Sequence, residues 1–167
     1  MRKLSDAAAG VIAEINDGSI GENKVVLLRS SSQSALAGAS SPFSNYQAVV
    51  HGSLTQTTGD YASYLTTNAF TAPTTSVLSF AVDIALKSTN SVSLRANTLV
   101  PARISGAFTG ATMSGNMPNA PLYIGRRGGT QFPFNGQLFG LVIRGALSST
   151  GEIQGSESYM NLHTGAY

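Results

Sequence analysis

The residue types most able to do chemistry lie in one loop of the second half of the chain, within LYIGRRGGTQFPFNGQLFGLVIRGAL, residues 122 to 147. Arg126 and Arg127 can donate to a carboxylate of an acidic sugar or of a neighbouring subunit, and Tyr123 or Phe132 can stack on an apolar ring. Glycine, proline and asparagine at this density are typical of a turn, with the arginines solvating a strand end. The sequence favours the turn and leaves open a ligand site made of Tyr123, Arg126, Arg127 and Asn135.

The carboxylates are not spaced for hydrolysis. Retaining glycosidases hold two carboxyl groups roughly 5 Å apart, which one strand provides at positions i and i+2. No two acids have that spacing; the acids are Asp6, Glu14, Asp17, Glu22, Asp60, Asp83, Glu152 and Glu157. A pair from distant strands, such as Asp60 with Asp83, stays open as a third hypothesis. We expect a protein that is not an enzyme.

Other catalytic and metal-binding constellations are equally sparse. The chain has no cysteine, and its two histidines, His51 and His163, accompany no G-x-S-x-G motif. Residues 17 to 19 read DGS, which is too few oxygen ligands for a calcium loop. We expect no cofactor and no metal, and we expect His163 to complement the dipole at the end of a helix.

Composition points to one globular domain, residues 1 to 167. Only 11% of residues are charged while 42% are hydrophobic, and ten basic residues oppose eight acidic ones. This balance indicates no nucleic-acid partner. The longest apolar segment, residues 77 to 86, is too short to cross a bilayer and contains Asp83. We therefore expect no membrane partner, and we interpret the N-terminal segment as uncleaved.

Period-two alternation gives the clearest structural prediction. Leu78, Phe80, Val82, Ile84 and Leu86 share one face of a strand, opposite smaller and polar residues. A turn at 87 to 90 leads into SVSLRANT, residues 91 to 98, where apolar residues continue the buried face and Arg95 faces outward. These two segments are predicted to form a hairpin.

Further strands are expected along the chain, at residues 24 to 29, 46 to 54, 60 to 70, 121 to 127 and 136 to 145. A Ser-rich stretch from residue 30 to 44 is predicted to be an exposed loop. The strand at 136 to 145 carries apolar residues on both faces, which is typical of a central strand covered on both sides. The Ser- and Thr-rich outward faces, together with Tyr61, Tyr64 and Tyr123, are candidates for a surface that faces a glycan or a neighbouring subunit, and the sequence favours ordinary solvated strand faces over this interpretation.

Two short helices are predicted at the ends. Residues 4 to 15 have Ser5 as a cap and apolar residues at helical spacing. Near the C-terminus, Ser149 and Glu152 match a capping box, and Gly165 suits the helix end. Short strands at intervals of about ten residues, with so few helices, predict an all-β fold, an antiparallel sandwich or jelly roll.

The segment from residue 122 to 153 resembles the C-terminal part of concanavalin A-like and laminin-G-like jelly-roll domains of tailed-phage virion proteins, and the resemblance covers roughly residues 3 to 167. The residues that carry the resemblance are the strand ending at Tyr123 to Gly125, the Phe134 to Gly136 turn, the strand from Leu138 to Arg144 and the helix after Ser149. SVSLRANT is similar to a hairpin strand with an L-R-x-N-G pattern, although Thr98 stands where the glycine would be.

The resemblance implies a non-enzymatic structural protein in the tail, fibre or capsid surface of a virion, assembled in the host cytoplasm. Its partners would be other virion proteins and further copies of itself in a symmetric oligomer. The alternative is a lectin-like domain that binds host surface glycans. Domains of this kind usually begin with additional strands, so this chain is either part of a larger domain or is completed by a partner chain.

Overall fold

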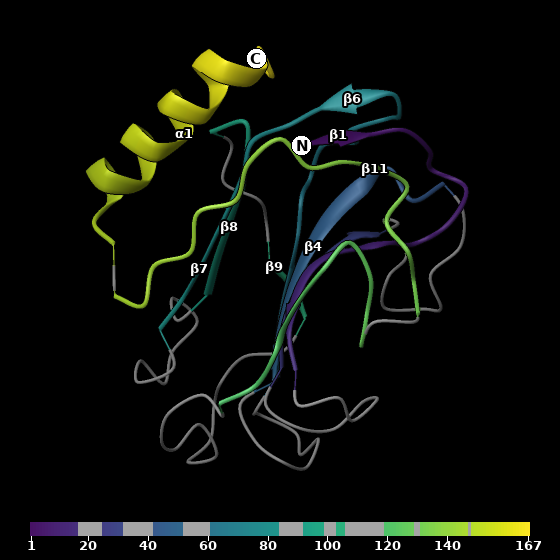
Figure 1. Ribbon diagram of the computed structural model, residues 1–167, viewed down its shortest axis with the longest axis horizontal. Helices are drawn as coiled ribbons and strands as arrows, with labels where there is room; N and C mark the ends of the chain where they lie inside the picture. The colour runs from purple at the N-terminus through teal and green to yellow at the C-terminus, as the bar shows by residue number, and fades with distance from the viewer. Residues whose placement is uncertain are drawn as a thin grey trace.

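The computed structural model describes residues 1–16, 25–31, 42–51, 61–83, 92–98, 103–105, 119–128, 131–146 and 148–167. These residues form three antiparallel sheets and one C-terminal helix. The mostly β architecture agrees with the sandwich that the alternating patterns predict. Figure 1 shows the layers edge-on, with the helix outermost.

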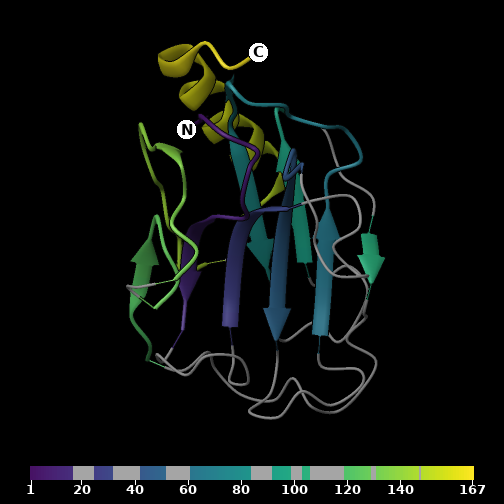
Figure 2. The same ribbon diagram turned by 90° about the vertical axis from the view of Figure 1, so that its right-hand side faces the viewer.

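The largest sheet has six strands that lie side by side in Figure 2. In spatial order they are β10 (Leu122–Ile124), β2 (Val11–Ile15), β3 (Val25–Ser31), β4 (Asn45–His51), β5 (Tyr61–Leu65) and β9 (Arg103–Ser105). All neighbours are antiparallel, and Leu28, Ala48 and Tyr64 lie in register across three adjacent strands. His51 ends β4, as expected for a residue at a strand end.

A second layer consists of β7 (Leu78–Val82) and β8 (Val92–Ala96), which lie behind the large sheet in Figure 2. Phe80 lies opposite Leu94, so the predicted hairpin pairing is confirmed. Residues 84 to 91, including Ile84 and Leu86, are outside the described residues. A third, small sheet places β1 (Arg2–Lys3) between β11 (Gly136–Gln137) and β6 (Thr74–Thr75).

The core lies between the large sheet and the β7–β8 pair. Ala48, Val50, Tyr64 and Leu94 form one buried cluster. The second cluster, Met1, Ile12, Tyr46 and Ala96, receives Leu78 and Phe134 at its margin. Burying these side chains between two sheets removes apolar surface from water, which is the main stabilising contribution in a chain without disulfides.

Strand β4 is buried on both faces, which the sequence did not predict. Tyr46, Ala48 and Val50 face the sandwich interior, and Val49 is also buried and packs with Val11 and Leu27 on the opposite face. The large sheet is therefore covered on both sides near its centre. Tyr64 is buried in the core, so its assignment to an outward-facing surface is wrong.

The predicted helix at residues 4 to 15 is wrong. Val11–Ile15 forms strand β2, and residues 4 to 10 lead into it without helical structure. The apolar spacing fits a helix, but β2 gains ladder hydrogen bonds from β10 on one side and β3 on the other. Ser5 accepts a hydrogen bond from Ala7 N at 3.1 Å, so it closes a local turn. Tertiary pairing thus overrides local propensity in a segment with three β-branched residues.

Helix α1 (Thr150–Thr164) is confirmed, including its ends. Ser149 caps it, and its hydroxyl and the Glu152 carboxylate complete the predicted capping box. Gly165 takes the left-handed conformation at the C-terminal cap, with φ 59°. His163 lies in the last turn, where a basic side chain complements the helix dipole.

Two predictions about loops and strands need correction. Both ends of the exposed loop expected at residues 30 to 44 are buried: Ser30 and Ser31 belong to β3, and Phe43 and Ser44 are buried as well. Residues 32 to 41 are outside the described residues. The central strand expected at 136 to 145 is reduced to Gly136–Gln137. Residues 138 to 144 belong to no strand, and their apolar side chains are exposed. The prediction of a covered central strand is wrong for residues 138 to 144, because no described strand pairs with this segment.

Candidate functional site

The loop that carries the predicted ligand residues is anchored by a buried carboxylate, Glu14 of strand β2. Glu14 is only 1% exposed. It accepts hydrogen bonds from Arg127 Nε at 3.1 Å and from Gly128 N at 3.3 Å, and Asn16 Nδ2 lies 3.3 Å from it. The Arg127 guanidinium therefore compensates a carboxylate that would otherwise lie uncompensated inside the fold.

Backbone hydrogen bonds fix the rest of the loop. Arg127 and Gln131 exchange two backbone hydrogen bonds, at 2.7 and 3.0 Å. Phe134 N donates to Gly125 O at 2.7 Å, and Val11 N donates to Phe132 O at 2.9 Å. The described residues of this corner loop, between residues 123 and 135, are thus tied to β2, in keeping with the predicted turn. The prediction that both arginines solvate a strand end is wrong for Arg127, which binds Glu14.

The four predicted ligand residues all belong to this corner, but they differ in availability. Tyr123 lies opposite Glu14 in the β10–β2 pairing and is half-buried. Arg127 is engaged with Glu14, whereas Arg126 is exposed. Asn135 is exposed and its backbone carbonyl accepts from Leu4 N at 2.9 Å. Phe132 is exposed and has a positive φ of 47°, which is strained for a bulky residue.

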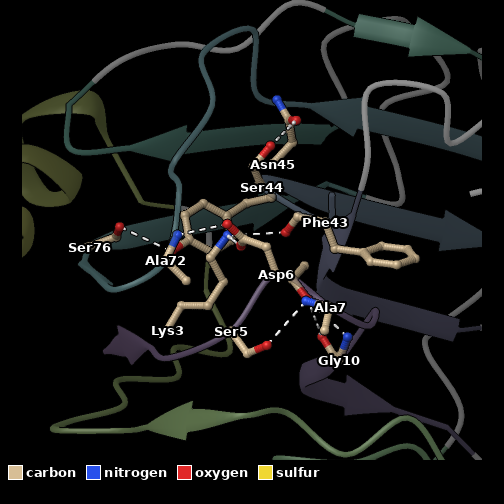
Figure 3. Close-up of polar contacts among 12 residues, drawn as sticks. Lys3, Ser5, Asp6, Ala7, Gly10, Phe43, Ser44, Asn45, Ala72 and Ser76 are labelled. Carbon is tan, nitrogen blue, oxygen red and sulfur yellow. Dashed lines mark hydrogen bonds and ion pairs between the residues drawn. The ribbon is translucent and has the colours of Figure 1, made fainter. Parts of the chain in front are cut away.

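A second polar cluster is buried between the N-terminal segment and the large sheet (Figure 3). Lys3 Nζ lies 2.6 Å from Asp6 Oδ1 and donates to Phe43 O at 3.1 Å. It also lies 5.2 Å from the centre of the Tyr46 ring, within cation–π range. The other Asp6 oxygen accepts from Ala72 N at 2.7 Å. Burial lowers the pKa of Lys3, while the hydrogen bond and charge of Asp6 oppose that change.

Tyr46 extends this cluster into the core. Its hydroxyl lies 3.1 Å from Ser76 Oγ, and its ring packs against Phe70 at a centroid distance of 5.2 Å. Burial raises the pKa of Tyr46 to about 12. Lys3 and Tyr46 are both fully buried, so no substrate reaches either of them. The cluster holds the N-terminal segment in place, and sequence reasoning missed it because residues 4 to 15 were predicted to form a helix.

Helix α1 is attached to the second layer by another ion pair. Arg95 of β8 donates to Glu157 of α1 at 2.7 and 3.1 Å, and Glu157 is buried. Arg95 faces away from the sandwich interior, as predicted, but the helix covers it. In a further ion pair, Arg144 lies 3.0 Å from Glu152 and both side chains are exposed. This pair links the helix to the preceding segment.

Beside this helix lies the largest concentration of exposed apolar side chains among the described residues. We call it the C-terminal apolar surface, and its members, 40 to 83% exposed, are Leu138, Phe139, Leu141, Val142, Ile143, Tyr159 and Leu162. An open pocket of about 350 Å³ lies within it, with Val142 and Arg144 on one side and Tyr159 and Met160 on the other. Sequence reasoning missed this surface because the pattern of residues 138 to 143 equally fits a buried strand.

Several charged groups of the described residues form ion pairs within the fold. Four of their carboxylates, those of Asp6, Glu14, Glu152 and Glu157, are bound to basic side chains. Within the described ranges no three acids, histidines or cysteines gather in a way that would hold a metal ion. Asp60, which was suggested to pair with Asp83, lies outside those ranges. The ring of His163 packs edge-on against Tyr159 at 4.6 Å.

In the described part of the chain, no helix has the length and apolar character to span a bilayer. Comparison of the chain with protein-family models, with curated proteins and with solved structures finds no match.

Proposed function

We propose that the chain is a non-enzymatic structural module of a bacteriophage virion, in a tail, fibre or capsid-surface position, that assembles by protein–protein contacts. The observation that carries this proposal is the C-terminal apolar surface. Monomeric proteins rarely expose contiguous apolar patches larger than a few hundred Å². Seven large side chains that are each at least 40% exposed present on the order of 800 Å².

The distribution of charge supports assembly over catalysis. The buried acids Glu14 and Glu157 each bind an arginine, and the buried Lys3 binds Asp6, so these groups stabilise the fold. At the C-terminal apolar surface, by contrast, the Arg144–Glu152 pair is half-exposed and lies beside the apolar pocket. An apolar centre with a polar edge is the usual arrangement of a protein interface.

The virion assignment rests on the resemblance of the C-terminal motif to jelly-roll domains of tailed phages. The resembling segments are also the ones that bear the surface, since residues 138 to 144 and the helix after Ser149 contribute all seven side chains. A virion appendage repeats one interface by symmetry, and such interfaces are formed by patches of this kind.

Light scattering coupled to size-exclusion chromatography tests the assembly function. The purified chain is expected to form a defined oligomer, whose molar mass from light scattering is constant across the elution peak. A chain that stays monomeric at millimolar concentration and binds no other virion protein would contradict the proposal. Labelling phage particles with an antibody against this chain then locates it on a tail, fibre or capsid.

A lectin-like function is the second candidate, and one observation favours it. The corner loop carries the exposed Arg126 and also Phe132, which is exposed in a strained conformation, and strain of this kind accumulates at ligand sites. On a glycan array, binding should be lost in Phe132→Ala and Arg126→Ala. Arg127 is a poor probe, because its removal disturbs Glu14. An array with no bound glycan, or binding that both variants retain, eliminates this candidate.

A further inference from the structure

We infer that the segment from Leu138 to Arg144 is an interface strand, and that its partner is the same segment of a second copy, antiparallel across a two-fold axis at Leu141. This inference rests on the proposed assembly function and specifies its interface. No comparison and no motif assigns such an interface to this chain.

The first step is the state of the segment itself. Residues 138 to 144 take part in no strand or bridge, although they continue directly from β11. They run toward the start of α1 along the β7–β8 layer in Figure 1. Exposed side chains occur at both odd and even positions, for example Ile143 at 56% and Val142 at 59%. An apolar segment that belongs to no strand of its own fold can serve as a template for pairing with another strand.

The second step concerns what covers the segment. Its exposed apolar area, with that of Tyr159 and Leu162, is of the same order as the roughly 800 Å² that each partner buries in an interface of standard size. Arg144 and Glu152 already form an ion pair within one copy, so the contact brings no uncompensated charge to the interface. A second copy therefore supplies the area that this surface needs to be covered.

The third step fixes the register. Antiparallel pairing about Leu141 places Phe139 opposite Ile143 on the same face, twice by symmetry. Aromatic and β-branched side chains are a favourable cross-strand pair. Gly140 then lies opposite Val142, and its small size matters because a Cβ there would already lie 3.3 Å from Met160 of the helix. The two Arg144 side chains lie at opposite ends, opposite Leu138, so like charges do not meet.

Cysteine cross-linking gives a sharp test, because the chain has no cysteine of its own. In the variant Leu141→Cys, the two introduced sulfurs face each other across the axis, with Cβ atoms about 4.5 to 5.5 Å apart in such pairs. We expect mild oxidation to convert most of the protein to a covalent dimer. Ile124→Cys is the matched control, since Ile124 is similarly exposed, at 48%, but lies on edge strand β10. It should cross-link at least tenfold more slowly.

Two results would overturn the inference and leave the assembly function standing. One is an oligomer in which Leu141→Cys does not cross-link, or in which Ile124→Cys cross-links as fast. The other is a monomer that binds a different virion protein through the C-terminal apolar surface. If the chain is monomeric and binds no virion protein, the inference and the proposed function fail together.

A charge variant supplies an independent readout. Leu141→Lys places two ammonium groups at the axis, and the 42% exposure of Leu141 lets lysine be tolerated within one copy. At a concentration where the unmodified chain is an oligomer, this variant should have half its mass or less, with an unchanged circular dichroism spectrum. Ile124→Lys should keep the mass of the oligomer. Equal masses for Leu141→Lys and the unmodified chain would refute the pairing.

Discussion

Arg95 of strand β8 and Glu157 of helix α1 are joined by two hydrogen bonds, of 2.7 Å from Nε and 3.1 Å from Nη2. They are 62 residues apart in the sequence. Glu157 is the one buried residue of the helix, and its hydrogen bond raises the pKa of Arg95. The helix therefore docks on the sandwich through a charge pair, and its apolar side chains Tyr159 and Leu162 are left exposed.

Glu157→Gln should detach the helix from the second layer. Removing one partner of a buried pair leaves the other charge uncompensated, and we expect the free energy of unfolding to fall by about 3 kcal/mol. Chemical denaturation measures this change, and faster proteolysis within residues 150 to 164 reports the detachment. Arg144→Met, which breaks the exposed pair with Glu152, is the control and should cost less than about 1 kcal/mol. Equal effects of the two variants would show that Glu157 does not hold the helix.

Replacement of the two adjacent arginines of the corner loop should have very different effects on the free energy of unfolding. Arg127→Ala removes the guanidinium from the buried Glu14 carboxylate, and we expect a loss of about 3 kcal/mol in thermal or chemical unfolding. Arg126→Ala alters an exposed side chain and should change stability by less than about 0.5 kcal/mol. The double variant Arg127→Ala with Glu14→Gln should recover part of the loss, because the uncompensated charge is gone. If Arg126→Ala were the more damaging variant, the assignment of the two side chains would be reversed.

The buried phenol of Tyr46 should lose its proton at a higher pH than an ordinary tyrosine. Its pKa is raised to about 12 by burial, so in an absorbance titration one tyrosine component should appear near pH 12 and vanish in Tyr46→Phe. The folded state holds this proton more tightly than the unfolded chain, whose tyrosine titrates near pH 10. The stability due to Tyr46 is therefore fully present below pH 10 and declines as the pH rises to about 12, by about 3 kcal/mol in total.

Lys3 changes the pH dependence of stability in the opposite direction, so the variant Tyr46→Phe is needed as a control. Because burial lowers its pKa, the unfolded chain binds this proton more tightly, and stability rises with pH between the lowered value and the ordinary value of 10.5. The difference between the unmodified chain and Tyr46→Phe isolates the phenol. An identical decline in stability for both proteins between pH 10 and 12 would disprove the contribution of Tyr46.

Replacing Thr98 with glycine should stabilise the fold. It has a φ of 66°, a left-handed conformation that is costly for a β-branched residue and free of strain for glycine. After the larger entropy of the unfolded glycine chain is subtracted, Thr98→Gly should raise the free energy of unfolding by about 1 kcal/mol. Thr71→Gly, at an exposed position without positive φ, should lower it. A loss of stability in Thr98→Gly would contradict the strained conformation.

The hairpin and the C-terminal helix could be predicted because their information is local. Alternation from Leu78 to Val82 identifies a strand with one buried face, and the Ser149 and Glu152 capping box places the helix start. The corner loop is also readable from its glycines and proline. The four candidate ligand residues remain a prediction, although the structure shows that Arg127 already has a partner in Glu14.

The sequence alone determined where the chain alternates, where it turns and where its last helix begins, since each of these depends on neighbouring residues along the chain. Only the tertiary structure decided that residues 11 to 15 form a strand, because their conformation depends on hydrogen bonds to β10 and β3. The tertiary structure also decided that the apolar side chains of residues 138 to 143 are exposed. Their apolar pattern specifies a surface that prefers to be covered, and the presence of a covering strand depends on what the fold brings beside it.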